Sequence, residues 1–398
     1  MMSRKNEEEK KMSFLFYTGF NNNTIIQNVE QLIMKREETL YTKTLSLLLE
    51  ESYKWDLVGN IFESYLVYCI ATSENPFSLW AEKKGAQMDE QVLDLARGDL
   101  EKLCYLYKHQ PFKEEIKGNK TKNLEVLEKL LETVTDSKMC IRQLAEYYHF
   151  YGAGKMNGYK AFKWNEKAGF IGISECDPIM LDELIGCEYQ KEALIKNTEN
   201  FLAGKVANNV LLFGDSGTGK SSLVKALLNT YVEKGLRMID LSKADFFHFN
   251  SISNELRKRG LKFIIFLDDL SFEEFETEYK YMKALIEGGV EIKPNNVLIY
   301  ATSNRRHLIR ETWDERVGQD VHIKDTRQEK LSLSERFGMT LTFTSPDQKA
   351  YLTIVEDLAQ KHGIVLPENV LREKAIQWEL VHGGRSGRVA KQFILSLL

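Results

Sequence analysis

Cysteine is scarce in this sequence, and its placement argues against a structural zinc site. The five cysteines are scattered over 398 residues, with no C-x-x-C pair and no histidine at ligand spacing. Structural zinc sites usually take their ligands from such closely spaced pairs. We therefore expect reduced thiols, which are typical of a cytoplasmic protein.

Long hydrophobic runs and a strong charge of either sign are also absent. No apolar run approaches the ~18 residues of a membrane-spanning helix, so no membrane partner is expected. Residues 1–13 lack the apolar core of a secretory signal, and we expect them to form a disordered tail. The formal net charge of −4 provides no overall attraction for nucleic acid, although it leaves room for a local basic groove.

Proline is nearly missing from residues 14–170, where only Pro76 and Pro111 occur. Apolar residues recur there at helical spacing. Because proline interrupts helices, this pattern predicts an all-helical N-terminal domain of roughly seven helices over residues 14–170. The aromatic-rich segment 147–151 is interpreted as core packing, with a partner-binding or base-stacking surface as the alternative.

A glycine-rich stretch with the sequence GDSGTGKS occupies residues 214–221. It fits the pattern G-x-x-x-x-G-K-[ST], in which backbone N–H groups surround an oligophosphate. Residues 210–213 predict a buried strand before it, and residues 222–228 predict an amphipathic helix after it. This context favours a phosphate-binding loop over a simple turn. The residues predicted to bind nucleotide are Gly214, Asp215, Ser216, Gly217, Thr218, Gly219, Lys220, Ser221 and Ser222.

Two residues of this loop have specific roles in the prediction. Lys220 would contact the β- and γ-phosphates, and the Ser221 hydroxyl would ligate Mg²⁺. The apolar run 263–267 predicts a central strand that ends at Asp268 and Asp269. Asp268 is expected to hold the hydration shell of Mg²⁺, and Asp269 to orient and deprotonate the attacking water.

Three more polar residues lie next to predicted strands or begin a helix. Asn304 comes after the predicted strand 297–301, where its amide is expected to position the attacking water. Arg336 precedes the last predicted strand, and we expect it to enter the site of a neighbouring subunit, with a surface salt bridge as the alternative. Arg388 begins the final helix and is expected to fold back onto the nucleotide, with Arg385 as the alternative.

The spacing of strands and helices predicts the architecture of the rest of the chain. Strands alternate with helices over residues 171–345, which predicts an α/β core with a doubly wound parallel sheet. The expected strands are 210–213, 236–241, 263–267, 297–301 and 339–343. Residues 346–398 return to helical spacing and are predicted to form a C-terminal helical lid.

The order of these motifs resembles that of the AAA+ ATPases. Residues 214–221 are similar to Walker A, and the pair Asp268–Asp269 is similar to Walker B. Asn304 is similar to sensor 1, Arg336 to the arginine finger and Arg388 to sensor 2. The resemblance implies that the chain binds ATP and Mg²⁺. It also implies that the adenine is contacted by Leu184, Ile185 and Gly186.

A closer resemblance is to the bacterial predicted-ATPase family known as domain of unknown function 815. It is carried by NNVLLFG at 208–214, DDLSF at 268–272, YATSNRRHL at 300–308 and GRSGR at 384–388. It is strong over residues 162–398 and less distinctive over the helical N-terminal part. It implies an ATP-binding AAA+ module without assigning a cellular role.

The sequence departs from the common AAA+ pattern in two respects. The usual Asp-Glu pair is Asp268–Asp269 here, and the shorter side chain of Asp269 favours slow turnover or a water-bridged base. Aromatic residues at 246–249 stand where a pore loop is expected, which disfavours an enzyme that threads polypeptides.

These observations favour an oligomeric ATPase that hydrolyses ATP at a site between subunits. The helical domain would select a protein partner for remodelling or loading. An ATP-dependent nucleic-acid loader and a slow nucleotide-gated switch or scaffold are alternatives. A small-molecule kinase is disfavoured by Asn304 and the lid arginines. The basic residues that favour nucleic acid are Arg257, Lys258, Arg259, Lys262, Arg305 and Arg306.

Overall fold

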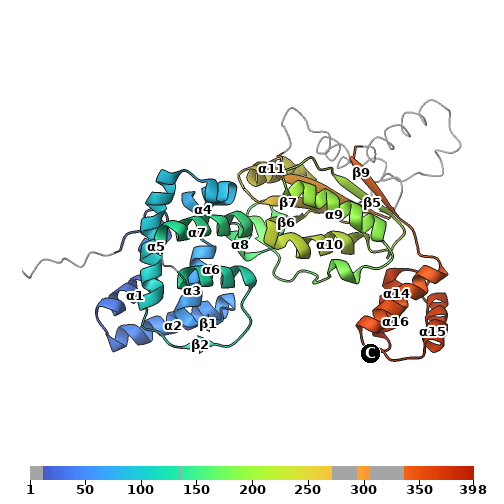
Figure 1. Ribbon diagram of the computed structural model, residues 1–398, viewed down its shortest axis with the longest axis horizontal. Helices are drawn as coiled ribbons and strands as arrows, with labels where there is room; N and C mark the ends of the chain where they lie inside the picture. The colour runs from blue at the N-terminus through green and yellow to red at the C-terminus, as the bar shows by residue number, and fades with distance from the viewer. Residues whose placement is uncertain (1–11, 134–135, 271–293, 305–335) are drawn as a thin grey trace, which may run out of the picture. The chain divides into compact units, whose positions relative to one another are not determined.

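The computed structural model describes residues 12–133, 136–270, 294–304 and 336–398. Arg305 and Arg306 lie outside these residues, as does most of the predicted N-terminal tail. The chain forms two compact units, which are described separately (Figure 1). Unit 1 consists of Met1–Tyr159, Glu233–Gly235 and Arg259–Leu261, and unit 2 of Lys160–Val232, Leu236–Lys258 and Lys262–Leu398.

Unit 1 is mainly helical, as predicted. Its buried apolar side chains form one core, which includes Tyr147 and Tyr148. The aromatic-rich segment therefore contributes to core packing, although Phe150 is 45% exposed. The elements are η1 Thr18–Asn22, α1 Thr24–Met34, α2 Glu38–Trp55, β1 Gly59–Asn60, α3 Ile61–Ala71, α4 Pro76–Lys84, η2 Gly85–Gln87, α5 Glu90–His109, β2 Glu115–Ile116, α6 Lys122–Glu132, α7 Ser137–Tyr151 and α8 Lys155–Gly158.

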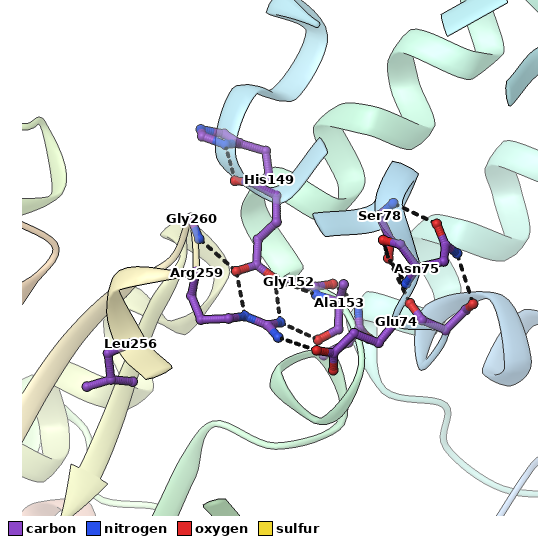
Figure 2. Close-up of polar contacts among 12 residues, drawn as sticks. Glu74, Asn75, Ser78, His149, Gly152, Ala153, Leu256, Arg259 and Gly260 are labelled. Carbon is purple, nitrogen blue, oxygen red and sulfur yellow. Dashed lines mark hydrogen bonds and ion pairs between the residues drawn. The ribbon is translucent and has the colours of Figure 1, made fainter. Parts of the chain in front are cut away.

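The two prolines of this unit stand at helix ends. Pro76 is in the first turn of α4, where its missing N–H needs no partner. The preceding Asn75 forms a capping box with Ser78, which satisfies backbone donors at the start of the helix (Figure 2). Pro111 follows soon after the end of α5 at His109.

A buried ion pair joins two distant sequence segments within unit 1. The carboxylate of Glu82, whose side chain is fully buried, accepts hydrogen bonds from Arg259 Nε at 2.9 Å and Nη2 at 2.5 Å. It also accepts the backbone N–H groups of Ala153 and Gly260. Arg259 further contacts the carbonyl of Ala153 and the carboxylate of Glu74 (Figure 2). Because these donors surround the Glu82 carboxylate, its burial is compensated.

The described residues of unit 2 form a seven-stranded sheet with the order β4-β3-β6-β7-β8-β5-β9. All its neighbouring strands are parallel except the antiparallel pair β3–β4. Every residue of β8 is buried, as expected for a central strand covered on both faces. The strands are β3 Ala161–Asn165, β4 Gly169–Gly172, β5 Val210–Gly214, β6 Leu236–Asp240, β7 Lys262–Leu267, β8 Val297–Ser303 and β9 Met339–Phe343.

The prediction that residues 14–170 are helical throughout is wrong at their end. Residues 161–172 form the hairpin β3–β4, and β3 extends the sheet of unit 2 beside β6. The side chain of Asn165 accepts two backbone N–H groups in the turn, and Gly169 has a φ of 69° that favours glycine. Such short strands offer little periodicity, so their pairing with each other and the pairing of β3 with β6 decide their conformation.

The helices of unit 2 complete the α/β core and the lid. Buried side chains of α9 and α10 pack against alternate residues of the central strands, such as Ile264 and Phe266. The three lid helices share a separate small core. Among the described residues, no helix is long and apolar enough to cross a membrane. The elements are η3 Leu181–Glu183, α9 Glu188–Leu202, α10 Lys220–Tyr231, η4 Val232–Lys234, η5 Lys243–His248, α11 Phe249–Arg257, α14 Gln348–Lys361, α15 Glu368–Val381 and α16 Gly387–Leu395.

Candidate nucleotide-binding site

The glycine-rich stretch forms a loop between β5 and α10. Gly214, Gly217 and Gly219 have φ values of 135°, 76° and 94°, a region that L side chains rarely adopt. Gly214 is also required for space, because a Cβ there would lie 1.8 Å from the carbonyl oxygen of Phe343. Gly219 is the N-cap residue of α10, so the positive end of the helix dipole faces the loop. This arrangement suits an oligophosphate.

Lys220 lies beneath the loop and is only 6% exposed. Its Nζ donates to the carbonyl oxygens of Gly214 at 2.9 Å and Asp215 at 2.6 Å. Burial lowers the pKa of Lys220, whereas nearby carboxylates, Asp215 foremost, act in the opposite direction. The ammonium group therefore lies against the phosphate-binding loop, and a phosphate would compete with the two carbonyls for it.

The carboxyl ends of β7 and β8 bring together the residues that were predicted to bind the metal ion and the attacking water. The strands are parallel and pair Leu267 with Ala301, so the residues that follow them meet at one edge. Asp268 Oδ1 accepts the hydroxyl of Ser221 at 2.6 Å, which links the strand end to the phosphate-binding loop. Carboxylate and hydroxyl oxygens are ligands that Mg²⁺ accepts, so this pair fits the predicted metal site.

Thr302 completes the edge and was not assigned a role from the sequence. Its hydroxyl donates to Asp268 Oδ1 at 2.6 Å and accepts the backbone N–H of Asp269 at 2.9 Å. Asn304 Nδ2 donates to Asp269 Oδ1 at 2.7 Å. Asp269 has a φ of 50°, which is uncommon for a residue other than glycine. These contacts over-determine the position of both carboxylates. A polar residue at the end of a buried strand is the signal that could have indicated Thr302.

The lid contributes one residue beside the loop. Ser386 is the N-cap residue of α16. The backbone N–H of Arg388, in the first turn of this helix, donates to the carbonyl oxygen of Gly217 at 3.2 Å. The side chain of Arg388 is exposed. Burial is the main cause of the lowered pKa of Lys220, and the positive charge of Arg388 lowers it further. Arg385 instead forms an ion pair with Glu379 inside the lid at 2.9 Å. This geometry favours Arg388 over Arg385 as the lid arginine near the loop.

The segment expected to contact adenine lies between the loop and the lid. Leu184 is 9% exposed, and a Cβ placed on Gly219 would lie 3.9 Å from its Cδ2. Ile185 packs against the lid core. Gly186 has a φ of 84° and faces Ile354 of α14. The apolar wall that these residues form suits a flat base.

Arg336 is not brought to the phosphate-binding loop of its own chain. It precedes β9, which is parallel to β5, whereas the loop follows the carboxyl end of β5. Arg336 therefore belongs to the opposite edge of the sheet. Its predicted place in a neighbouring subunit's site is compatible with this position.

A core with this strand order, phosphate-binding loop and helical lid defines a nucleotide-binding protein of the AAA+ superfamily. The family model described as Protein of unknown function (DUF815) matches residues 157–398, and the chain belongs to that family.

Sequence relatives include the chromosomal replication initiator protein DnaA of Helicobacter pylori (strain HPAG1), which is 25% identical over 193 residues. That of Helicobacter acinonychis (strain Sheeba) is 25% identical over 189 residues. Each match covers 44% of this chain and 38% of the relative.

Similar solved structures include a variant of RuvB from Thermotoga maritima, with 17% identity and a TM-score of 0.35. That match covers 55% of this chain and 72% of RuvB. A crystal structure titled as a DNA replication initiation factor has 18% identity and a TM-score of 0.36, covering 56% of this chain and 64% of that one.

Proposed function

We propose that this protein is an ATPase that binds ATP and Mg²⁺ at the 214–222 loop. The observation that carries the proposal is the connected set of side chains at the ends of β7 and β8. It runs from Ser221 through the Asp268 carboxylate and the Thr302 hydroxyl to the backbone N–H of Asp269, whose carboxylate accepts a hydrogen bond from Asn304. A phosphate-binding loop alone would serve many reactions, whereas two positioned carboxylates with an amide suit metal-assisted hydrolysis.

Each residue has a defined role in this proposal. Lys220 binds the β- and γ-phosphates after it leaves the carbonyls of Gly214 and Asp215. Ser221 and Asp268 hold Mg²⁺, which would neutralise phosphate charge when bound. Asp269 accepts a proton from the attacking water, and Asn304 holds its carboxylate in position.

Other residues bind the remaining parts of the nucleotide. The wall of Leu184, Ile185 and Gly186 contacts adenine, and Arg388 approaches the phosphates from the lid. Arg336 enters the site of a second copy and stabilises the charge that develops in phosphoryl transfer. The assembly would then be a homo-oligomer that remodels or loads a partner selected by the helical unit.

The test measures ATP turnover per subunit as the protein concentration is raised. We expect the rate of the wild type to increase with concentration and that of Arg336→Ala to stay low while ATP binding persists. Arg142→Ala, which removes an arginine from an ion pair with Glu90 in unit 1, is the matched control. Lys220→Ala is expected to abolish ATP binding. Retained affinity in that variant would contradict the assignment of the loop.

A second candidate function is a slow nucleotide-dependent switch. It is favoured by Asp269, whose short carboxylate already accepts a hydrogen bond from Asn304. A low rate that does not depend on concentration or on Arg336 would favour this function over a shared site between subunits.

Nucleic-acid loading remains a proposal that rests on the names of the relatives. Chromosomal replication initiator proteins are among them, but the basic residues identified in this chain lend little support. Arg259 is paired with Glu82 in the interior, and Lys258 is paired with Glu255. Binding to nucleic acid that falls steeply with salt concentration would support it, and an absence of binding would exclude it.

A further inference from the structure

The phosphate-binding loop and the connection to the lid follow two neighbouring strands of the sheet. β5 continues into the loop, and β9 continues through residues 344–347 into α14. The two strands are parallel neighbours, with Gly214 opposite Phe343 at their last paired position. The backbone N–H of Asp215 extends this pairing by donating to the Phe343 carbonyl at 2.9 Å.

Asp215 also contacts the connection through its side chain. Its Oδ2 accepts the backbone N–H of Ser345 at 2.7 Å. The backbone and hydroxyl donors of Ser345 lower the pKa of the Asp215 carboxyl, so the acceptor is an ionised carboxylate at neutral pH. Pro346 follows and restricts Ser345 to extended conformations, which keeps its N–H in place.

Besides the Asp215–Ser345 contact, the phosphate-binding loop makes a hydrogen bond to the lid and another to Lys220. The carbonyl of Gly217 accepts the N–H of Arg388 at the start of α16. The carbonyl of Asp215 accepts a hydrogen bond from Lys220. When Lys220 turns to a phosphate, it leaves the residue whose side chain holds the lid connection. The Asp215–Ser345 hydrogen bond therefore connects the loop directly to the segment that leads into the lid.

A carboxylate is also an unusual group to place beside a polyphosphate. Its negative charge repels the ligand, so affinity alone does not account for Asp215. We propose that Asp215 is a positioning residue that fastens the phosphate-binding loop to the lid connection, so that occupancy of the loop determines the state of the lid. This inference rests on the proposed binding of ATP and adds a regulatory contact within the same site.

Two substitutions separate the charge of Asp215 from its hydrogen bond. Asp215→Asn keeps an acceptor for Ser345 and removes the charge, whereas Asp215→Ala removes both. Asp347→Ala is the matched control, because Asp347 lies in the same connection but caps α14 by accepting the N–H of Ala350. The full-length protein is used, and hydrogen–deuterium exchange is measured with and without Mg·ATP, together with the dissociation constant for ATP.

We expect Asp215→Ala to raise the exchange rate of the Ser345 amide about tenfold without nucleotide, as for loss of a hydrogen bond to a charged group. It should also remove the effect of ATP on exchange in α16. Asp215→Asn should retain most of the protection and bind ATP more tightly than the wild type. Asp347→Ala should loosen the first turn of α14 and leave the Ser345 amide protected.

The outcomes distinguish this inference from the proposed function. Equal Ser345 exchange and an equal ATP response in Asp215→Ala and the wild type would overturn it. Identical behaviour of the Asn and Ala variants would show that charge alone acts, and would overturn it as well. If the wild type binds no ATP, the proposed function fails, and the inferred control of the lid fails with it. Ser345 exchange without nucleotide still reports whether the hydrogen bond itself forms.

Discussion

Tyr300 has a hydroxyl in the middle of the buried strand β8. The side chain is fully buried, and its oxygen lies 3.0 Å from Asn197 Nδ2 and 2.9 Å from Thr198 Oγ1. Burial raises the pKa of Tyr300 to about 12, although these two hydrogen bonds offset part of the rise. The ordinary tyrosine pKa near 10 applies in the unfolded chain.

The shift predicts how stability depends on alkaline pH. Tyr300 is neutral in both states below pH ~10, whereas above it the unfolded state loses the proton first. Its contribution is therefore complete below pH ~10 and declines by ~3 kcal/mol as the pH rises through about 12. The free energy of unfolding of Tyr300→Phe, measured in urea across this range, should fall less steeply than that of the wild type.

The control for this prediction is Tyr53→Phe, which removes a hydroxyl from a side chain that is 93% exposed. Tyr300→Phe also loses two hydrogen bonds, so it should be less stable at neutral pH by about 1 kcal/mol. Equal slopes for Tyr300→Phe and the wild type above pH 10 would contradict the prediction.

Residue spacing predicted some site contacts and not others. Lys220 and Ser221 belong to a short sequence motif, and this local pattern is enough to predict their positions in the loop. The contact of Ser221 with Asp268 was implied by the assigned roles, because both were expected to serve one metal ion. The contact of Asp215 with Ser345 had no such signal, since it depends on the pairing of β5 with β9.

At the scale of elements, the pairing of β7 with β8 assembles the proposed catalytic edge. Thr302 is 2% exposed and links the two strand ends through its hydroxyl. A group that orients a metal-binding carboxylate from behind usually affects metal affinity strongly. In the proposed site, the pairing would therefore support metal binding as well as the core.

Thr302→Val removes this hydroxyl with little change of shape. We expect the apparent affinity for Mg²⁺ in ATP turnover to fall by roughly 10–100-fold. Turnover is measured as a function of Mg²⁺ concentration, and Thr302→Ser should restore most of the affinity because it restores the hydroxyl. Thr340→Val, at an exposed position of β9, is the matched control. An unchanged Mg²⁺ dependence in Thr302→Val would exclude the role of Thr302.

Long apolar strands were predictable at this scale, and the short hairpin was not. The strand β9 lies at the predicted residues 339–343, and β7 begins one residue before the prediction. The unbroken apolar run of β7 identifies a strand that is buried on both faces, whereas β9 alternates polar and apolar residues at the edge of the sheet. The hairpin β3–β4 joins the sheet because β3 pairs with β6, which is far away in the sequence.

At the scale of the whole molecule, the chain returns to unit 1 twice after leaving it. Glu233–Gly235 and Arg259–Leu261 belong to unit 1, although both interrupt the sequence of unit 2. Arg259 is bound to Glu82, and Leu261 is 1% exposed. Leu261 is followed directly by β7, and the proposed metal ligand Asp268 comes directly after the end of that strand.

The buried ion pair predicts a large stability effect within this arrangement. Glu82→Ala would remove the buried carboxylate that pairs with the Arg259 guanidinium and accepts two backbone N–H groups. We expect a loss of ~3–5 kcal/mol in the free energy of unfolding, measured in urea by circular dichroism. Glu90→Ala removes the exposed partner of Arg142 and should cost less than ~1 kcal/mol. Equal effects of the two substitutions would contradict the structural role of Glu82.

The sequence by itself determined the helical first part, the phosphate-binding loop, the long strands and the lid. These features depend on the local periodicity of apolar residues and on the spacing of residues that are close together in the sequence. Only the tertiary structure decided that residues 161–172 join the sheet, that Arg259 pairs with Glu82 and that Thr302 links the Asp268 carboxylate to the backbone N–H of Asp269. Those contacts form between segments that are far apart in the sequence. Their favourable free energy is gained only after folding has brought the segments together, so no local pattern indicates them.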